Sequence, residues 1–587
     1  MIKNNYFTDN EDLMLHFDTL IDFQEIINEY EQDFRDAKKY EETSDERYAM
    51  APHDEEAARE YYREVLTNVG DIAGNHVAQN AGTMDKIGLK LEDGKVIFPD
   101  KMNELWEMFK NAGLMPYMLR RESGGLGLPV IVYNMLQEVL SRADISFLMS
   151  TAVLNLAETI EKFASHEVKE KWLPKMANSE YTGAMALTEP NFGSDLSSVN
   201  TRATKQADGT YLINGTKRFI THGCGMTGIP AVILTLARTG EPGSGARGLS
   251  FFAVDGSKVQ TAGIEHKMGL KCSPTCEIVY EDSPADLIGE EGYGLTRYAM
   301  GMMNGARLAV GTLGIAVSTA TFEESKKYAN EREQFGKLIK DIPAVKKMLD
   351  RMEREIVAMR CLNMEAARMI DLYLWRMERL AEEGVSDRDI RKDETIKYWD
   401  KLATLFTPLN KYYCSEMSNV LTYDGIQIHG GVGYTEEFDV ARIYRDARIL
   451  TIYEGTTQLQ IVAAIGGIVA GMTAKGQLRM YLDKLMQEFT PSAISQKLYK
   501  ILEKAVNSYK EIENKDYFAS EVVEITARLV SGLLLEKTTA KVNGEAKTNR
   551  ARLSNDYNIE SLAICQADLI RLESAKRKQP ALDMISA

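Results

Sequence analysis

The sequence lacks most features that mark secreted, metal-dependent or nucleic-acid-binding proteins. Its 587 residues include only six cysteines, which are scattered and follow no disulfide spacing, as in a protein of a reducing compartment. Cys272 and Cys276 lie four residues apart without a second Cys/His pair nearby, so no metal site is expected. The net charge of −16 argues against a nucleic-acid partner, because such a partner requires a positive face.

Long hydrophobic runs are also lacking. The longest covers residues 461–472, well short of the roughly 20 residues that span a bilayer. The N-terminus has no basic segment followed by an apolar one, and the last three residues, Ile585 to Ala587, are not a peroxisomal signal. We therefore expect a cytoplasmic protein without a membrane span.

The chain is long enough for three or four domains, and its pattern of apolar and polar residues changes along the sequence. Apolar residues recur with a helical period at both ends, whereas the middle shows strand-like alternation and turn dipeptides. The expected fold is α+β and mostly α. Its domains are an N-terminal helical domain (1–182), a β-barrel or sandwich (183–293), a helical bundle (294–472) and an additional helical domain (473–587).

Glycine pairs predict turns within this plan. Asp208-Gly209 and Asn214-Gly215 bracket a short strand over 210–213, as two tight hairpin turns would. The glycine-rich segment 124–129 lacks the Lys-Ser/Thr of a phosphate loop, and Pro129 follows the glycines instead. We expect this segment to be a structural loop between helices.

Two segments of the β-domain carry candidate binding residues. Residues 185–198 are rich in neutral hydrogen-bond donors, among them Thr188, Ser194 and the backbone at Gly193, and would hold a polar heterocycle or a phosphate. A capped turn explains this segment equally well. Phe219 with Thr221 would stack on a ring and bind its edge, although a core aromatic is the simpler interpretation.

A third candidate follows a long helix. Arg332, next to Gln334 and Phe335, would clamp a pyrophosphate, although an ion pair with a neighbouring glutamate is the common alternative. A fourth is the stretch 423–460. Its Gln427, Gly430, Gly431 and Gly433 would let the backbone approach a phosphate, a weak signal alone.

The same stretch ends in a single carboxylate, Glu454, placed in a turn before a helix. Thr457 and Gln460 fit a capping box, and an apolar run follows. The carboxylate is therefore expected at the positive end of a helix rather than on an amphipathic face.

Taken together, these segments resemble one family, the acyl-CoA dehydrogenases. The resemblance runs from Ser123 to Gln460 through SGGLGLP, LPKMANSE, ALTEPNFGSDLSS, INGTKRFITHG, RLAVGTLGIA, EREQFGKLIKDIPAVKKM, QIHGGVGYTEE and RDARILTIYEGTTQLQ. The long C-terminus, with GIEHKMGLKCSPTC and MMNGAR, is most similar to the subclass that includes methylmercaptopropionyl-CoA dehydrogenases.

The resemblance implies an FAD site. The positions that match flavin contacts are Met185, Leu187, Thr188, Gly193, Ser194, Phe219, Thr221, Arg332, Gln334, Phe335, Thr456 and Gln458, and in addition Gln427, Gly430, Gly431 and Gly433, which family members donate from a neighbouring subunit. A homodimer or homotetramer is therefore implied. Many members have Trp at the position of Phe219, and the Phe219 ring retains a stacking face.

For the acyl-CoA substrate, the matching positions are Ser194, Asn304, Arg307, Tyr453 and Gly455, with Asn304 replacing the Asp of shorter members. Glu454 matches the catalytic base, and Ala306 before Arg307 excludes the helix-borne base of some relatives. The family's base removes the α-proton while a hydride leaves the β-carbon for flavin N5. The enolate oxygen binds the base's own N–H and a ribityl hydroxyl.

The expected function is thus the dehydrogenation of an acyl-CoA to trans-2-enoyl-CoA, as in fatty acid β-oxidation, with electrons passed to an electron-transfer flavoprotein. Two alternatives share the fold. One is an acyl-CoA oxidase that uses oxygen, and the other is a flavoprotein with a DNA-associated role through its C-terminal domain. That domain has a basic cluster at 576–578 but also abundant Glu and Asp.

Overall fold

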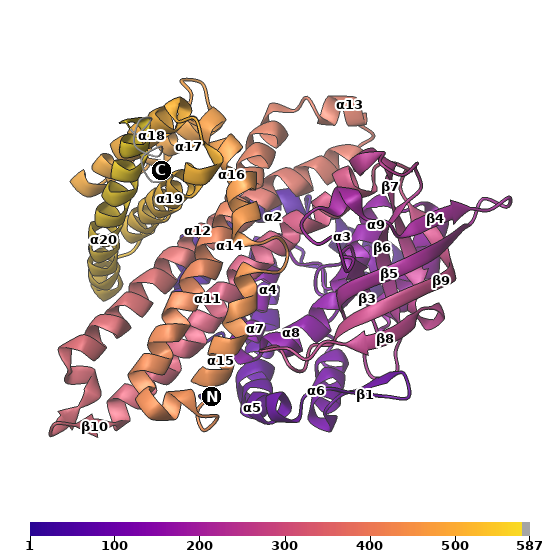
Figure 1. Ribbon diagram of the computed structural model, residues 1–587, viewed down its shortest axis with the longest axis horizontal. Helices are drawn as coiled ribbons and strands as arrows, with labels where there is room; N and C mark the ends of the chain where they lie inside the picture. Colours follow the sequence, from indigo (N-terminus) through magenta and orange to yellow (C-terminus); the bar gives the residue numbers. More distant parts are fainter. Residues whose placement is uncertain (578–587) are drawn as a thin grey trace, which may run out of the picture. The chain divides into compact units, whose positions relative to one another are not determined.

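The computed structural model describes residues 1–577, so the terminal tripeptide 585–587 and Lys578 of the basic cluster lie outside the described residues. The chain forms two compact units, coloured by sequence in Figure 1. The first contains Met1–Asn10 and Glu31–Ala306, and the second contains Glu11–Tyr30 and the chain from Arg307 onward. Each unit is described separately below.

The first unit begins with helices. They are α3 (Arg35–Thr43), α4 (Glu55–Ile72), α5 (Ala78–Ile87), α6 (Asp100–Asn111), α7 (Val130–Ala143), α8 (Ile145–Ala152), α9 (Ala157–Phe163) and α10 (His166–Ala177), with a small hairpin of β1 (Lys90–Glu92) and β2 (Lys95–Ile97) before α6. Side-chain caps start several of them, as where Asp54 accepts a hydrogen bond from Ala57 N at 2.8 Å. Every residue of α7 is buried, so this helix forms the centre of the helical layer.

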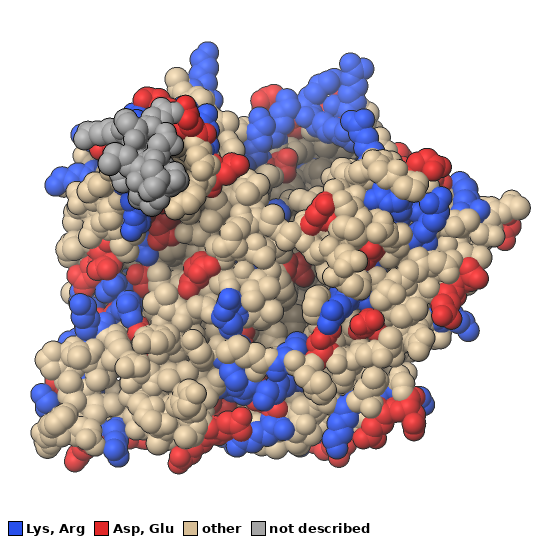
Figure 2. Space-filling model, viewed as in Figure 1, with Lys and Arg blue, Asp and Glu red and all other residues tan. Residues whose placement is uncertain are grey.

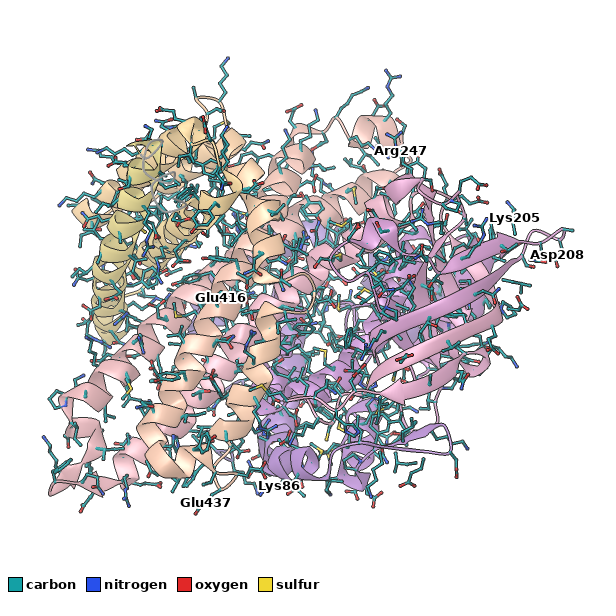
Figure 3. All side chains as sticks on the ribbon, viewed as in Figure 1. Lys86, Lys205, Asp208, Arg247, Glu416 and Glu437 are labelled. Carbon is teal, nitrogen blue, oxygen red and sulfur yellow. The ribbon has the colours of Figure 1, made fainter. Side chains whose placement is uncertain are left out.

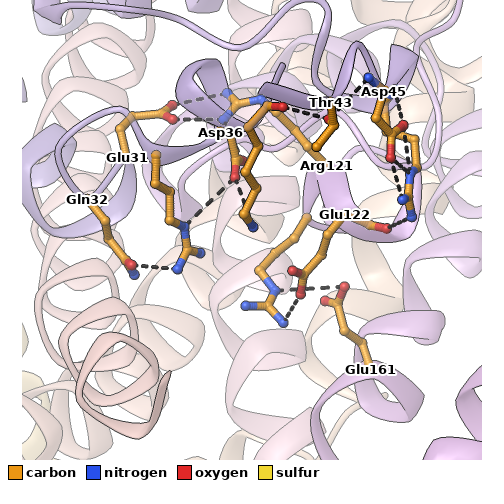
Figure 4. A network of polar contacts seen from close by, with 12 residues as sticks. Glu31, Gln32, Asp36, Thr43, Asp45, Arg121, Glu122 and Glu161 are labelled. Carbon is orange, nitrogen blue, oxygen red and sulfur yellow. Dashed lines mark hydrogen bonds and ion pairs between the residues drawn. The ribbon is translucent and has the colours of Figure 1, made fainter. Parts of the chain in front are cut away.

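The glycine segment at 124–129 is a loop, as predicted, and a buried arginine holds it. Arg121 donates to both oxygens of Glu31, at 2.7 and 3.0 Å (Figure 4). It also donates to Gly127 O at 3.1 Å. Gly127 has φ +63°, and a Cβ there would meet the Arg121 side chain at 2.6 Å. The glycine is therefore required by packing against Arg121, which supports a structural role for the loop.

The rest of the first unit is a strand barrel. Its strands are β3 (Thr182–Ala186), β4 (Arg202–Lys205), β5 (Tyr211–Thr221), β6 (Ala231–Arg238), β7 (Leu249–Asp255), β8 (Gln260–Ile264) and β9 (Thr275–Ile288). The order β3-β6-β4-β5-β9-β7, with β7 pairing back to β6 and β8 pairing with β9, closes a ring. One core fills the ring around Ile233 and Ile278, and a second packs its outer face against Trp172 and Ile160 of the helices.

One of the two predicted turns in this barrel is correct and the other is wrong. Asp208-Gly209 lies in the β4–β5 connection, where Lys205 pairs with Tyr211. Asn214-Gly215, however, lies within β5, at a register shift against β9. Gly215 has φ +145° and a Cβ there would lie 2.7 Å from Thr201 Oγ1, so the glycine permits a bulge instead of ending the strand.

The second unit is all helical apart from a short hairpin. Its elements are α1 (Glu11–Leu15), α2 (Phe23–Tyr30), α11 (Met300–Glu331, which starts in the first unit), β10 (Glu333–Gln334), β11 (Lys337–Leu338), α12 (Pro343–Glu382), α13 (Asp387–Ile390), α14 (Glu394–His429), α15 (Val440–Ala447), α16 (Thr457–Gly471), α17 (Gln477–Leu485), α18 (Ala493–Glu511), α19 (Ala519–Lys541) and α20 (Gly544–Arg577). Small residues bring α11 and α14 close, since a Cβ on Gly314 would lie 2.6 Å from Cys414 O.

The N-terminal helices α1 and α2 belong to this second unit. Asp12 forms ion pairs with both Arg360 of α12 and Arg550 of α20, and α2 packs on α12. The predicted segment 1–182 is therefore divided between the two units, because a buried carboxylate here finds its cations in the distant helices.

The C-terminal helices share this unit with the bundle. Tyr412 of α14 donates to Glu524 of α19 at 2.9 Å, and the hydroxyls of Tyr413 and Tyr557 lie 2.8 Å apart. Helix α16 also packs against α19. The predicted fold class is confirmed: a helical N-terminal part, a middle strand barrel, and a helical C-terminal part with additional helices.

Surface charge and helix hydropathy complete the description. On the face seen in Figure 2, Lys and Arg are interspersed with Asp and Glu over much of the surface. One described helix, Gly294–Glu331, is apolar and long enough to cross a membrane, but 78% of its apolar window is buried in the protein. A core helix of a bundle has the same properties.

Candidate active site

The carboxylate Glu454 lies in a tight turn between two helical segments. The turn follows residues 448–451, and α16 begins at Thr457. Glu454 has φ +56° and Gly455 φ +86°, so two successive residues adopt the left-handed conformation. A glutamate rarely adopts it, which indicates that the surroundings fix this turn.

The predicted capping box at this turn is wrong by one residue. Thr456, not Thr457, is the N-cap, and its Oγ accepts a hydrogen bond from Leu459 N at 3.5 Å. The Thr457 hydroxyl donates to Glu416, a residue of α14 labelled in Figure 3. Gln460 does not complete a capping box, because its amide donates to carbonyl groups of the turn instead.

A buried lysine holds the turn from the side of α14. Lys411 Nζ donates to Tyr453 O at 2.7 Å and to Gly455 O. Gln460 Nε2 donates to Gly455 O at 2.8 Å and to Glu454 O at 3.3 Å. Sequence reasoning missed Lys411. Its one available signal is that it is the only charged residue from 402 to 415, in a run that is otherwise typical of a buried helix.

Two cations and burial act on the Glu454 carboxylate in opposite directions. Burial raises its pKa, whereas the charges of Lys411 and Arg307 lower it, and the net shift is upward. Burial lowers the pKa of Lys411 to about 8, although Glu454 acts to raise it, and burial also lowers the pKa of Arg307. The carboxylate therefore binds a proton more readily than an ordinary glutamate does.

The neighbouring substrate candidates lie on the turn and on α11. Within residues 1–577 the buried hydroxyl of Tyr453 has no hydrogen-bond partner, an unusual state for a buried polar atom. Arg307 is buried, and Asn304 lies one turn earlier on the same helix. The third substrate candidate of this turn, Gly455, has its carbonyl oxygen taken by Lys411 and Gln460.

In the first unit, the structure brings the candidate residues of the β-domain together. Arg218 N donates to Thr188 O at 2.9 Å, which places residues 187–188 beside Phe219 and Thr221 at the end of β5. A Cβ on Gly193 would lie 3.8 Å from Thr188 Cγ2, so the exposed loop with Ser194 returns to the same place. Met185, in β3, precedes this segment and is half-buried.

Another buried lysine fixes this segment. Lys217 Nζ donates to Leu187 O at 2.8 Å and forms an ion pair with Glu189 at 3.0 Å. Glu189 in turn accepts from the N–H groups of Asn200 and Thr201, at 2.7 and 2.8 Å. Phe219 is not a core aromatic, because its side chain is 55% exposed and its φ is +62°.

The remaining candidates gather where α11 and α14 end. The Tyr328 and His429 rings stack there at 4.4 Å, close in sequence to Arg332 and to Gln427. Phe335 is 91% exposed with φ +55°. In the described part of the chain Arg332 makes no ion pair, which argues against the simpler interpretation that it pairs with a neighbouring glutamate.

The glycines at this end differ in what they do. A Cβ on Gly430 or Gly431 would meet nothing within 4 Å, so both are open to a ligand, as is the exposed Gln427 beside them. Gly433 is buried, and a Cβ there would lie 2.7 Å from His429 Cβ, so it serves packing. Lys411 and Gln427 are 16 residues apart on α14, about 24 Å at the rise of a helix. The stretch 423–460 thus contains two separate clusters.

Thr456 and Gln458 follow Glu454 at the start of α16, where Gln458 is exposed. No group of three or more His, Cys, Asp or Glu suited to a metal ion exists among residues 1–577, and the two spaced thiols, Cys272 and Cys276, are both buried and not in disulfides. Around Glu454 the protein itself supplies a carboxylate, the two cations Lys411 and Arg307, and backbone groups.

Comparisons with known proteins agree with this geometry. Family models match in three parts: the acyl-CoA dehydrogenase N-terminal domain at residues 59–180, the middle domain at 184–283, and the C-terminal domain at 294–373 and 396–465. The 3-methylmercaptopropionyl-CoA dehydrogenase of Ruegeria pomeroyi is 35% identical over 70% of this chain and 72% of its own.

Two further relatives extend the comparison. The caffeyl-CoA reductase-Etf complex subunit CarC of Acetobacterium woodii is 34% identical over 53% of this chain and 73% of its own. An acyl-CoA dehydrogenase from Bacillus anthracis, solved in complex with FAD, covers 90% of both chains with a TM-score of 0.73 and 23% identity, and so supports the fold. On these matches and on the arrangement around Glu454, the chain belongs to the acyl-CoA dehydrogenase family, whose members are FAD-dependent oxidoreductases.

Proposed function

We propose that this protein dehydrogenates an acyl-CoA thioester to the trans-2-enoyl-CoA with Glu454 as the base. The observation that carries the proposal is the left-handed turn that presents Glu454 with a raised pKa beside Arg307 and Lys411. A base with a raised pKa is better matched to the weakly acidic α-proton of a thioester than an ordinary carboxylate is. The α-proton passes to Glu454, and the β-hydrogen leaves with its electron pair.

The residues of the chain fit FAD as the acceptor of that pair. Phe219 offers an exposed ring face, and the segment around Thr188 and Ser194 offers neutral donors suited to a flat heterocycle. Arg332, without an ion pair among residues 1–577, is available for a pyrophosphate. FAD, when bound, supplies the acceptor for the hydride.

The two clusters of the stretch 423–460 support an oligomer. Gln427 lies about 24 Å along α14 from Lys411, and Gly430 lies just past the end of this helix, so both serve a different part of a bound molecule from the one that Glu454 serves. We infer that they contact the flavin of a neighbouring subunit, in a homodimer or homotetramer. Sedimentation of the FAD-loaded protein, before and after Gln427→Glu, tests this inference.

The proposed electron acceptor is an electron-transfer flavoprotein, in a cytoplasmic fatty acid β-oxidation. The Etf complex named for the relative from Acetobacterium woodii supports it. With acyl-CoA in excess, turnover that depends on added electron-transfer flavoprotein is expected. Stoichiometric peroxide formation under air would instead identify an oxidase.

Glu454→Gln is the direct test of the base. Flavin bleaching on addition of acyl-CoAs of several lengths is followed by stopped flow in the wild type, in Glu454→Gln and in Glu437→Gln. Glu437 is an exposed control outside the site (Figure 3). The expected result is bleaching in the wild type and the control and its loss, by at least 10³-fold, in Glu454→Gln. Undiminished bleaching in Glu454→Gln would exclude this base.

A further inference from the structure

Three successive carbonyl groups of the catalytic turn are bound on one side. Tyr453 O accepts from Lys411, Glu454 O from Gln460, and Gly455 O from both. The two donors come from different helices, since Lys411 lies on α14 and Gln460 in the first turns of α16. This arrangement fixes the direction of three peptide planes at once.

The direction of the carbonyl groups determines the direction of the N–H groups. In a trans peptide the C=O and the following N–H point to opposite sides of the chain. The carbonyls of residues 453, 454 and 455 face Lys411 and Gln460, so the N–H groups of Glu454, Gly455 and Thr456 face away from them. Within residues 1–577, none of these three N–H groups donates to a protein acceptor.

We propose that Lys411 is a positioning residue for the dehydrogenation. Its ammonium group holds the Tyr453 carbonyl so that the Glu454 N–H, in the same peptide unit, is aimed at the thioester oxygen on which negative charge develops. The inference rests on the proposed function, because only an enolate-forming reaction requires a donor at that place. It adds a residue that neither the motifs nor the base itself indicates.

The chemistry of the contact suits this role. A hydrogen bond from a charged donor polarises the peptide that accepts it, and a polarised peptide has a stronger N–H donor at its other end. Gln460, a neutral donor, orients the adjacent Glu454–Gly455 peptide, while Lys411 acts on the peptide of the catalytic N–H. A hydrocarbon at position 411 would leave that peptide unpolarised and free to rotate.

The helix that carries Lys411 is itself held in place. Tyr413, two residues later, donates to Glu355 of α12 at 2.6 Å, and its hydroxyl lies 2.8 Å from that of Tyr557 in α20. Lys411 thus projects from a rigid element, as a group that fixes a turn must.

The experiment compares Lys411→Met, Lys411→Arg and a matched control, Tyr412→Phe. The control lies beside Lys411 on α14 and loses its contact to Glu524, but it does not touch the turn. The readouts are FAD content, thermal unfolding, the rate of flavin bleaching against pH, and α-hydrogen exchange. The exchange in D₂O uses an acyl-CoA analogue without a β-hydrogen, which isolates proton removal from hydride transfer.

For Lys411→Met we expect bleaching and α-hydrogen exchange to fall together by about 10²-fold, with FAD content retained. Three groups face Glu454: Lys411 from α14, Arg307 from α11 and Tyr453 on the same turn. Glu416 also faces Lys411. Removal of one of the two cations raises the pKa of Glu454, so the acid limb of the bleaching profile moves to higher pH. A residue that only stabilises the fold would not move it.

Lys411→Arg keeps the charge but changes the position of the donors. We expect its acid limb to stay in place while the rate falls, which separates orientation from electrostatics. Tyr412→Phe should remain within threefold of the wild type in both rates, whatever its unfolding temperature. Rates in Lys411→Met within threefold of the wild type, with an unmoved acid limb, would overturn the inference. If instead the wild type failed to bleach or Glu454→Gln bleached normally, the proposed function would fail.

Discussion

Each of the two compact units contains a buried lysine that binds backbone carbonyl groups beside candidate residues, but among the described residues only one of the two lysines has a carboxylate partner. Lys217 of β5 binds Leu187 O and forms an ion pair with Glu189, whose side chain is also buried. Lys411 of α14 binds two carbonyl groups and, among the described residues, has no carboxylate within ion-pair distance. Burial lowers the pKa of both to about 8.

Because of this difference in partners, we expect Lys217 to affect mainly the stability of the fold and Lys411 mainly the activity. At Lys217 the charge is compensated inside the barrel, as an ion pair that braces residues 187–201, which include the segment proposed to contact the flavin (the flavin segment). At Lys411 the positive charge is left to act on its surroundings, where the carboxylate with the largest effect on it is that of the proposed base. A lysine with a permanent partner supports the fold, whereas one without it tunes a neighbouring group.

Lys217→Met is expected to have the largest effect on stability. It leaves Glu189 buried without its cation, which costs about 3–5 kcal/mol in unfolding free energy. Loss of FAD is expected along with it, because the flavin segment loses its brace. Urea unfolding and flavin content measure the two effects.

The double variant Lys217→Met/Glu189→Gln sharpens this test. A neutral pair leaves no uncompensated charge, so the double variant should recover more than half of the lost stability. If the stability losses of the two single substitutions simply added in the double variant, the ion pair would not be what holds the segment.

Lys411→Met should cost less, about 1–3 kcal/mol, because it leaves carbonyl oxygens rather than a charge without a partner. The main effect of Lys411→Met is thus expected on the rate with FAD retained, whereas that of Lys217→Met is expected on stability and FAD content. A Lys411→Met variant that unfolded as readily as Lys217→Met, in the same urea series, would remove the contrast.

Gln460→Met is expected to cost about 1 kcal/mol, since Lys411 still binds Gly455 O and only the Glu454 carbonyl loses its donor. Its effect on flavin bleaching should be about tenfold, smaller than that of Lys411→Met, because the peptide of the catalytic N–H keeps its partner. Equal rate losses in the two variants would assign the orientation to the turn as a whole. The measurement is stopped-flow bleaching at one saturating acyl-CoA concentration.

The smallest expected effect is a pH dependence of stability at the half-buried Glu454. Its folded pKa lies above the ordinary value of 4.5, so between the two the folded state binds more protons than the unfolded state. The unfolding free energy of the wild type therefore falls as pH rises through this window, relative to Glu454→Gln, which has no such group. Urea unfolding of both proteins at pH 4.5 and at pH 7.5 measures the difference, and a difference independent of pH would contradict the raised pKa.

Local signals were enough to predict the fold class and the position of the carboxylate. The turn before α16 is marked by its own residues, and Arg332 at the end of α11 could be placed in the same way. These local signals failed where contacts with an element distant in the sequence determine the structure. Asn214-Gly215 reads as a turn, but pairing with β9 carries β5 through it. A second failure is local. Thr456 and Thr457 both fit an N-cap, and Gln460, expected in the capping box, instead donates to carbonyl groups of the preceding turn.

Lys411 shows the same limit most clearly. Its role depends on carbonyl groups more than 40 residues later in the chain, and no spacing rule connects a helical lysine to them. The direction of the Glu454 pKa shift likewise could not be predicted from the sequence, because the opposing effects of burial and positive charge must be compared in three dimensions.

The ion pairs of Asp12 have a consequence for the order in which the protein forms. Arg360 and Arg550 follow Asp12 by 348 and 538 residues, so Asp12 is synthesised long before either cation. Helices α1 and α2 therefore lack these cations while residues 31–306 of the first unit are synthesised. The second unit can close only after Arg550 has been made, so until then the acidic segment 11–30 is accessible to chaperones.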